Sequence, residues 1–291
     1  MNGIILIDKE KEYTSHDVVA IVKKITKSKV GHTGTLDPNA TGVLPLLVGD
    51  ATKVSKYLIN HDKEYIVELQ LGKKTTTADI EGDIIEEKEV QNWIFEDKER
   101  LERILQSFVG KQKQIPPMYS AIKVNGKKLY DYARQGKEIK IEPRNIEIYK
   151  IELLSVDRNQ ETINFKVKCS KGTYIRSLCE DIATKLETAG YMKNLRRIQV
   201  GSFKIEDSIT ITKLKKDMES GNKLNLIPVE KILMDIPTIE LKEEKLKLYL
   251  NGVKIKTDKE NGVYRVLINN KFIGTGIIKD NTLKRDIVLD V

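Results

Sequence analysis

The sequence predicts a protein of mixed helices and strands that ends in a small β-rich appendage. Segments with the alternation of strands and segments with the spacing of amphipathic helices are interspersed over residues 1–235. The remaining residues, 236–291, contain three short strand-like runs. A chain of 291 residues fits one large domain with a small one at roughly 150 residues per domain. We therefore expect a boundary between Pro228 and Pro237.

Each element of the first half follows from a local pattern. The apolar run at 4–7 indicates a buried strand, and Thr14-Ser15 marks the start of a helix because apolar residues recur at helical spacing after it. Residues 31–49 begin with a Gly- and Thr-rich loop that leads into an apolar run. The further expected elements are a strand at 65–71 and an amphipathic helix at 93–109 that is ended by Gly110.

The second half continues the mixture. Alternation predicts strands at 146–156, 162–169 and 195–205, and a helix runs from near Tyr174 to about Leu186. In the appendage we expect a short helix at 243–250 and strands at 263–268, 272–278 and 287–289. Asn269-Asn270 separates the first two of these strands as a turn.

The charge of the chain is unevenly distributed. The net charge is +8, and residues 111–150 contain ten Lys and Arg against four Asp and Glu, which is most of the excess. Prolines and tyrosines are interleaved with these charges. Such a basic segment, which includes Lys123, Lys127 and Lys128, indicates a polyanionic partner. The alternative is a merely solvated surface.

Nothing in the sequence indicates export or a membrane. Cys169 and Cys179 are ten residues apart, a spacing that suits neither a disulfide framework nor a zinc site. The N-terminus lacks a basic segment followed by a long apolar one, and no run approaches the ~18 apolar residues that a spanning helix needs. We expect a cytoplasmic protein with reduced thiols.

The segment Gly31-His32-Thr33-Gly34-Thr35-Leu36-Asp37-Pro38 and the residues after it, up to Pro45, form the most informative stretch of the sequence. Its glycines permit backbone conformations that other residues resist, but it lacks the pattern of a P-loop nucleotide site. From the residues alone, Asp37 is equally well explained as a turn residue that caps its own backbone.

This stretch closely resembles the catalytic motif of the TruB family of tRNA pseudouridine synthases. Four further segments resemble motifs of the same family, in the same order along the chain. They are Lys63-Glu64-Tyr65, the run 114–123 with its continuation to 136, the run 169–178, and Leu195-Arg196-Arg197 followed by Gly201. Five ordered motifs are a specific signal, and they cover about residues 1–235.

The resemblance implies an α+β protein with the pseudouridine synthase fold, built around a mixed, largely antiparallel sheet. Residues 1–235 would form the catalytic domain, with 111–150 as an insertion that clamps RNA. Residues 236–291 would form a short RNA-binding domain that resembles PUA domains. The implied partner is the T arm of tRNA, bound by a monomer without a protein partner.

The resemblance also implies a reaction. The family breaks the N-glycosidic bond of a uridine, turns the base and rejoins it through C5, which requires no cofactor. Here the substrate would be uridine 55 in the T loop, flipped out of its stack. Asp37 would attack C1′ or remove a proton from C2′, and both routes stay open. Arg176 would keep Asp37 ionised and oriented, although an arginine at this place can also form a simple surface ion pair.

Further residues acquire roles only through the resemblance. Tyr65 would stack on the flipped uracil, and as a catalytic residue its hydroxyl would help to remove the C5 proton. Tyr174 and Leu195 would line the same pocket. By pattern alone, all three belong to the core. His32 would contact the RNA near the flipped nucleotide, while Lys123, Lys127 and Lys128 would grip its backbone.

Three alternative functions compete with this interpretation. Asp79, Glu81 and Asp83 suggest a calcium loop, but their spacing fails the EF-hand pattern, so we expect no metal. A guide-dependent relative that acts on ribosomal RNA usually lacks the insertion and has a fuller PUA domain. A non-catalytic protein that binds or folds tRNA would not need Asp37, Tyr65 and Arg176 together.

Overall fold

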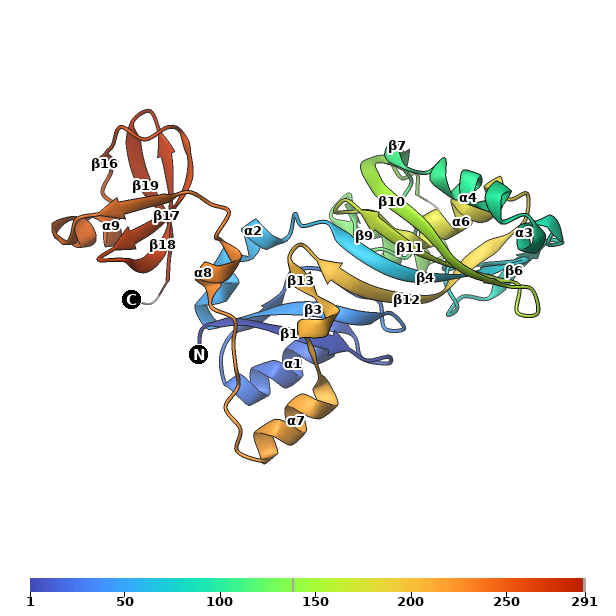
Figure 1. The fold of residues 1–291 in the computed structure, drawn as a ribbon, viewed down its shortest axis with the longest axis horizontal. Coiled ribbons are helices and arrows are strands. Elements are labelled where there is room, and N and C mark those ends of the chain that lie inside the picture. The colour runs from blue at the N-terminus through green and yellow to red at the C-terminus, as the bar shows by residue number, and fades with distance from the viewer. Residues whose placement is uncertain (138, 290–291) are drawn as a thin grey trace.

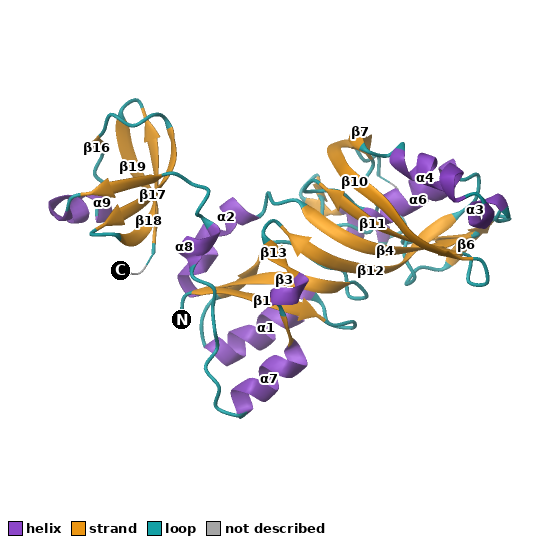
Figure 2. Ribbon diagram, in the orientation of Figure 1, coloured by secondary structure: helices purple, strands orange, loops and turns teal. Residues whose placement is uncertain are grey.

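A computed structural model describes residues 1–137 and 139–289. Figure 1 shows an elongated molecule in which the part of the chain after residue 236, which we call the C-terminal unit, lies at one end, beside the N-terminus. Helices and strands are interspersed along the chain, as expected (Figure 2). None of the helices in the described residues has the length and apolar character required to cross a membrane.

The centre of the fold is a mixed sheet to which ten strands of the described residues belong. These strands are β1 (Gly3–Lys9), β2 (Val30–His32), β3 (Thr41–Val48), β4 (Lys63–Leu71), β7 (Gly110–Gln114), β10 (Arg144–Asp157), β11 (Thr162–Cys169), β12 (Gly190–Val200), β13 (Phe203–Lys204) and β14 (Ile209–Thr210). Their order is β14–β1–β3–β12–β4–β11–β10–β7, with β13 beside β12 and β2 beside β3. Among the described strands of this sheet only β1–β14 and β3–β12 pair in parallel, so the predicted mixed, largely antiparallel sheet is confirmed.

Helices and short hairpins surround this sheet. The α-helices are α1 (Ser15–Thr26), α2 (Ser55–Leu58), α3 (Trp93–Glu96), α4 (Lys98–Gln106), α5 (Leu129–Ala133), α6 (Ile175–Lys185), α7 (Ile211–Glu219), α8 (Val229–Ile232) and α9 (Leu246–Leu250). The 3-10 helices are η1 (Gly49–Val54), η2 (Ile205–Asp207) and η3 (Glu243–Lys245). The hairpins are β5 (Lys73–Thr75) with β6 (Ile84–Glu87), and β8 (Lys123–Val124) with β9 (Lys127–Lys128).

Strand β1 is buried on both faces, which explains its uninterrupted apolar sequence. Because side chains alternate along a strand, Ile5 and Ile7 enter one core while Ile4 and Leu6 enter another. The first core lies under α1, α4, α6 and α7, and the second under α2, α8 and the C-terminal unit. Helix α1 begins as predicted, because Thr14 and Asp17 form a reciprocal capping box.

Two elements predicted within residues 1–235 have clearly different bounds. The helix expected at 93–109 is interrupted at Asp97, which leaves the helical conformation and caps α4 by accepting a hydrogen bond from Arg100 N. The strand expected at 195–205 is β12, which begins five residues earlier and ends at Val200. There Gly201, with a φ of 56°, turns the chain into β13.

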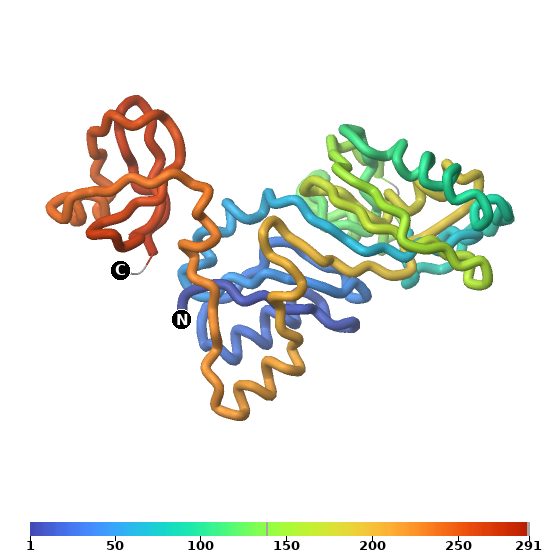
Figure 3. Tube along the Cα trace, viewed as in Figure 1, coloured from blue at the N-terminus to red at the C-terminus, as the bar shows by residue number. Residues whose placement is uncertain are grey.

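The C-terminal unit is a five-stranded sheet in the order β15–β17–β18–β19–β16. Its strands are β15 (Thr238–Leu241), β16 (Ile255–Lys256), β17 (Gly262–Ile268), β18 (Lys271–Lys279) and β19 (Thr282–Val288). Asn269 and Asn270, both with positive φ, form the predicted turn. The strand expected at 287–289 in fact starts at Thr282, and β15 and β16 had no clear pattern. Figure 3 shows the chain passing from α8 into this unit.

Candidate active site

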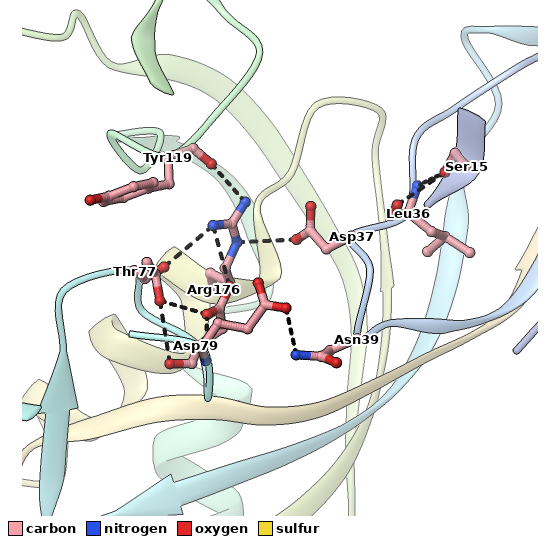
Figure 4. Close-up of polar contacts among 9 residues, drawn as sticks. Ser15, Leu36, Asp37, Asn39, Thr77, Asp79, Tyr119 and Arg176 are labelled. Atoms are coloured by element: carbon pink, nitrogen blue, oxygen red, sulfur yellow. Dashed lines mark hydrogen bonds and ion pairs between the residues drawn. The ribbon is translucent and has the colours of Figure 1, made fainter. Parts of the chain in front are cut away.

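The loop between β2 and β3 carries Asp37 and is held at several points. Ser15 Oγ donates to the carbonyl of Leu36 at 3.0 Å and accepts from its amide at 2.9 Å (Figure 4). Lys9 Nζ donates to the carbonyl of Pro38 at 2.9 Å. Asn39 Nδ2 donates to Glu81 Oε1 at 2.7 Å. The loop therefore has a fixed conformation, which the turn-like sequence alone did not require.

Arg176 lies in the first turn of α6 and faces Asp37, as expected from the sequence. Its Nε is 3.3 Å from Asp37 Oδ2, and its Nη1 is 3.5 Å from Asp79 Oδ2. Nη1 and Nη2 also donate to the carbonyls of Thr77 and Tyr119, at 3.3 and 3.0 Å (Figure 4). One buried guanidinium is thus shared by two carboxylates, which fixes its orientation.

Asp79 belongs to a tight turn whose hydrogen bonds hold its carboxylate against Arg176. Its Oδ1 accepts from Thr77 Oγ1 at 2.5 Å and from the amide of Glu81 at 3.1 Å. Burial, and then the charges of Asp79 and Asp37, raise the pKa of Glu81. The sequence assigned no role to Asp79, and in the structure its carboxylate forms an ion pair with Arg176.

These groups open onto a pocket of about 730 Å³. Of the candidate residues, the structure brings Asp37, Tyr65, Tyr174, Arg176 and Leu195 together in its wall. Tyr65 is 8% exposed, so only a small part of its surface is open to the pocket. Burial raises the pKa of Tyr65 to about 12. The size of the pocket suits a nucleoside.

The backbone of Tyr174 is held by Gln114, which lies near the start of the basic segment 111–150. The Gln114 side chain accepts from the amide of Tyr174 at 2.8 Å and donates to its carbonyl at 3.0 Å. In addition, Ser177 Oγ donates to the carbonyl of Ile115 at 2.9 Å. The N-terminal end of α6, which carries Arg176, is therefore tied to the end of β7.

His32 lies on β2, outside the residues that line the pocket. Its ring packs edge-on against His16 with a centroid distance of 5.7 Å. Within the described residues, its buried Nδ1 has no hydrogen-bond partner. Burial, followed by the charges of His16 and Arg197, lowers the pKa of His32.

The insertion expected at 111–150 is shorter in the structure, because both ends of this basic segment belong to the main sheet. Its two ends are β7 and the first part of β10, which pair with each other at the edge of the main sheet. Residues 115–143 lie between these strands and include the β8–β9 hairpin and α5. We call residues 115–143 the flap. Because Tyr119, Ser120, Ala121 and Tyr130 line the pocket, the flap forms one of its walls.

The three flap lysines lie on the β8–β9 hairpin, away from the pocket lining. Lys123 and Lys127 are exposed. Lys128 is half-buried, and its Nζ donates to the hydroxyl of Tyr130 at 2.7 Å. Only the first two thus present a free ammonium group to solvent.

The sequence reasoning missed Lys9, Lys63 and Arg197 as parts of this site. Lys63 and Arg197 line the pocket, and Lys9 holds the loop beneath it. The available signal was position: Lys63 precedes Tyr65 by two residues, and Arg197 follows Leu195 by two. Because side chains alternate along a strand, each pair points to the same face.

Comparisons with known proteins agree along the whole chain. Residues 22–175 match the model of the TruB family pseudouridylate synthase N-terminal domain. Residues 176–234 match a tRNA pseudouridylate synthase B C-terminal domain, and 237–285 a Pseudouridine synthase II TruB C-terminal domain.

Curated relatives and solved structures are similar over most of their length. tRNA pseudouridine synthase B of Clostridium kluyveri is 45% identical over 293 residues, which covers 98% of each chain. The protein of that name from Caldanaerobacter subterraneus subsp. tengcongensis is 42% identical, again over 98% of each chain. A chain in a crystal structure of a Cbf5-Nop10-Gar1 complex is 26% identical, with a TM-score of 0.69 over 99% of this chain and 83% of that one. A chain in an H/ACA RNP bound to a substrate RNA has the same fold, with a TM-score of 0.70 at 24% identity over 99% of this chain and 85% of that one.

Proposed function

The chain belongs to the TruB family of pseudouridine synthases, and we propose that it isomerises uridine 55 in the T loop of tRNA to pseudouridine. The observation that carries the proposal is the pair of Asp37 and Arg176 in the wall of a pocket of nucleoside size. Asp37 is 39% exposed, so its carboxylate is accessible, whereas the Arg176 side chain is 8% exposed. A reactive carboxylate needs this combination of access and fixed orientation.

We propose the following division of roles. The target uridine flips out of its stack and enters the pocket, where Tyr65 stacks on the uracil and Tyr174 and Leu195 enclose it. Asp37 then attacks C1′ or takes a proton from C2′ as the bond between C1′ and N1 breaks. The base turns and its C5 bonds to C1′, which displaces the Asp37 carboxylate or, on the other route, is accompanied by return of the proton to C2′. C5 then loses its proton and N1 gains one. Because no electrons leave the substrate and no water is consumed, the chemistry requires no cofactor.

The flap and the C-terminal unit suit the same substrate. The flap, which forms one wall of the pocket, carries the exposed Lys123 and Lys127 outside the pocket lining. Residues 236–291 contain eleven Lys and Arg against eight Asp and Glu, a modest basic excess. We propose that residues 1–235 act as the catalytic domain and that the C-terminal unit adds RNA contacts outside the T loop, in a monomer. Two free, buried cysteines suit a reducing cytoplasm.

Tritium release tests this proposal directly. T-arm RNA carrying [5-³H]uridine only at position 55 is incubated with the wild-type protein and with Asp37→Asn, and RNA affinity is measured in parallel. We expect release by the wild type alone and similar affinity for both. A wild type that binds this RNA without releasing tritium would refute the assigned target. Release by Asp37→Asn at the wild-type rate would remove Asp37 from the reaction.

A further inference from the structure

Arg197 is the largest side chain that is fully buried in the described residues, and it borders the pocket. It lies on β12, directly opposite Tyr65 on β4, in an antiparallel pair. Directly opposed residues point to the same face of a sheet, so the two side chains are neighbours in the pocket floor.

The guanidinium of Arg197 connects the two ends of the loop that carries Asp37. Its Nε donates to the carbonyl of Val43 at 2.9 Å, and its Nη2 donates to the carbonyl of Gly34 at 3.1 Å. Arg197 therefore closes the loop across its base, while Asp37 stands near the middle of the loop.

The charge of Arg197 has no compensating carboxylate. Within residues 1–137 and 139–289, no ion pair is found for Arg197, although Arg176 pairs with Asp37 and the adjacent Arg196 pairs with Asp8. Burial lowers the pKa of Arg197, and the neighbouring Tyr65 partly offsets this effect. An arginine nevertheless stays protonated in proteins. A buried positive charge without a counter-charge is costly, so its presence beside the pocket requires an explanation.

We propose that Arg197 stabilises the negative charge that the uracil acquires when its bond to C1′ breaks. The inference rests on the proposed pseudouridine chemistry. In that step the electron pair of the C1′–N1 bond leaves with the base, which becomes an anion. The sugar either forms a bond to the Asp37 carboxylate at C1′ or gives its C2′ proton to it.

The two charges of the site then match the two products of bond breaking. Asp37 faces the electron-poor sugar, and Arg197, beside Tyr65, faces the electron-rich base. A fixed charge in a water-excluded site interacts more strongly with an opposite charge than it would in water. Because the uracil is neutral before the bond breaks, the interaction strengthens toward the transition state and accelerates the step.

The test compares Arg197→Met, which removes the charge at similar length, with Arg197→Lys, which keeps it. Arg196→Met is the matched control, since Arg196 is the next residue on β12 and its ion pair with Asp8 lies outside the pocket lining. Tritium release is measured in a single turnover, together with RNA affinity and thermal unfolding. We expect Arg197→Met to slow release by about 100-fold or more without weakening RNA binding. Arg197→Lys should recover part of the rate, and Arg196→Met should behave like the wild type.

A second substrate distinguishes the effect of the Arg197 charge on the uracil from the effect of Arg197 on the conformation of the Asp37 loop. Fluorine at C5 withdraws electrons and stabilises the uracil anion, so RNA with 5-fluorouridine at the target depends less on Arg197. Its consumption is followed in nuclease digests, with Arg197→Lys as the variant if Arg197→Met does not fold. We expect a clearly smaller ratio of wild-type to variant rates on this RNA than on uridine RNA. An equal ratio, or an Arg197→Met rate near that of the wild type, would overturn the inference. Failure of the proposed function differs from both, because the wild type itself would then release no tritium.

Discussion

Arg176 and Asp37 form an ion pair that is buried at one end and open at the other. The Nε of Arg176 lies 3.3 Å from Asp37 Oδ2, yet the arginine side chain is 8% exposed and that of the aspartate 39%. Asp79, Thr77 and Tyr119 hold the guanidinium from its buried side. The arginine is therefore a fixed support, and the carboxylate of Asp37 keeps an accessible face for a substrate.

We expect Arg176→Lys to slow tritium release by about 100-fold, because a lysine cannot hold Asp37, Asp79 and two carbonyls in one plane. RNA affinity should change little. Arg176→Ala should also lower the free energy of unfolding by about 3–5 kcal/mol, since it leaves the largely buried Asp79 carboxylate without a counter-charge. The control is Arg158→Lys, whose ion pair with Glu96 is exposed. If Arg176→Lys released tritium at the wild-type rate, the planar guanidinium of Arg176 would not be needed for the reaction.

Gly42 should tolerate no side chain. Its φ is 109°, and a Cβ at this position would lie 2.1 Å from the carbonyl oxygen of Arg197. Because the obstructing atom belongs to the backbone, Gly42→Ala should cost about 2–4 kcal/mol of unfolding free energy. Gly31→Ala is the matched control in the same segment, as the nearest atom to its Cβ would be 3.9 Å away. Urea unfolding measures both, and equal stabilities of the two variants would contradict the prediction.

The flap lysines should contribute to RNA affinity by neutralising phosphates. Replacing Lys123 and Lys127 with glutamine should weaken binding and lower the slope of log K against log salt by about 0.7–0.9 for each phosphate that is no longer neutralised. Lys128→Gln should have a smaller effect, because its ammonium group is bound to Tyr130. Lys98→Gln, on α4 and paired with Glu102, serves as a control that removes one lysine charge outside the flap. An unchanged slope in the double variant would place the phosphates elsewhere.

Local patterns predicted the strands β1, β4, β10, β11 and β12 of the main sheet, because alternation or an apolar run reveals which of their residues are buried. They could not predict the break at Asp97, where a capping side chain overrides a continuous helical pattern. Strands β15 and β16 were also missed, because each is short and depends on its neighbours in the sheet.

The site shows a similar division. The family resemblance selected Asp37, Tyr65 and Arg176, and the structure brings these three residues to one pocket. Their roles stay predictions. Arg197 was missed although its spacing from Leu195 offered a signal, because its neighbour Arg196 has the same side chain. Only the alternation of side chains along β12 separates the buried Arg197 from the half-buried Arg196.

A polar contact joins the C-terminal unit to the rest of the protein. Asp286 on β19 accepts hydrogen bonds from Lys56, Tyr57 and Thr275. We expect Tyr57→Phe to weaken this contact by about 1–3 kcal/mol, because a partly buried carboxylate loses a donor. Hydrogen exchange at β19 should become faster. Tyr149→Phe is the control, since its hydroxyl donates to Asp62 at the surface. Equal exchange rates in the two variants would show that the contact does not hold the unit.

Lys9 is buried, and its ammonium group is bound to three backbone carbonyls. Its Nζ donates to Tyr13 at 2.7 Å, to Pro38 at 2.9 Å and to Glu10 at 3.1 Å. Burial lowers the pKa of Lys9 to about 8, although the charge of Asp37 partly opposes this shift. In the unfolded chain the pKa returns to its ordinary value near ~10.4.

The pH dependence of stability follows from this difference. Between pH 8 and about 10.4, Lys9 is neutral in the folded protein and protonated in the unfolded chain. Unfolding then takes up a proton, so stability rises with pH across this window, and the full cost of burying the charge is present below it. Relative to Lys9→Met, the wild type should gain up to about 3 kcal/mol between pH 7.5 and 10.5. Urea unfolding of both proteins at several pH values measures the gain. The exposed Lys11→Met should show none, and parallel curves for wild type and Lys9→Met would mean that Lys9 keeps an ordinary pKa when buried.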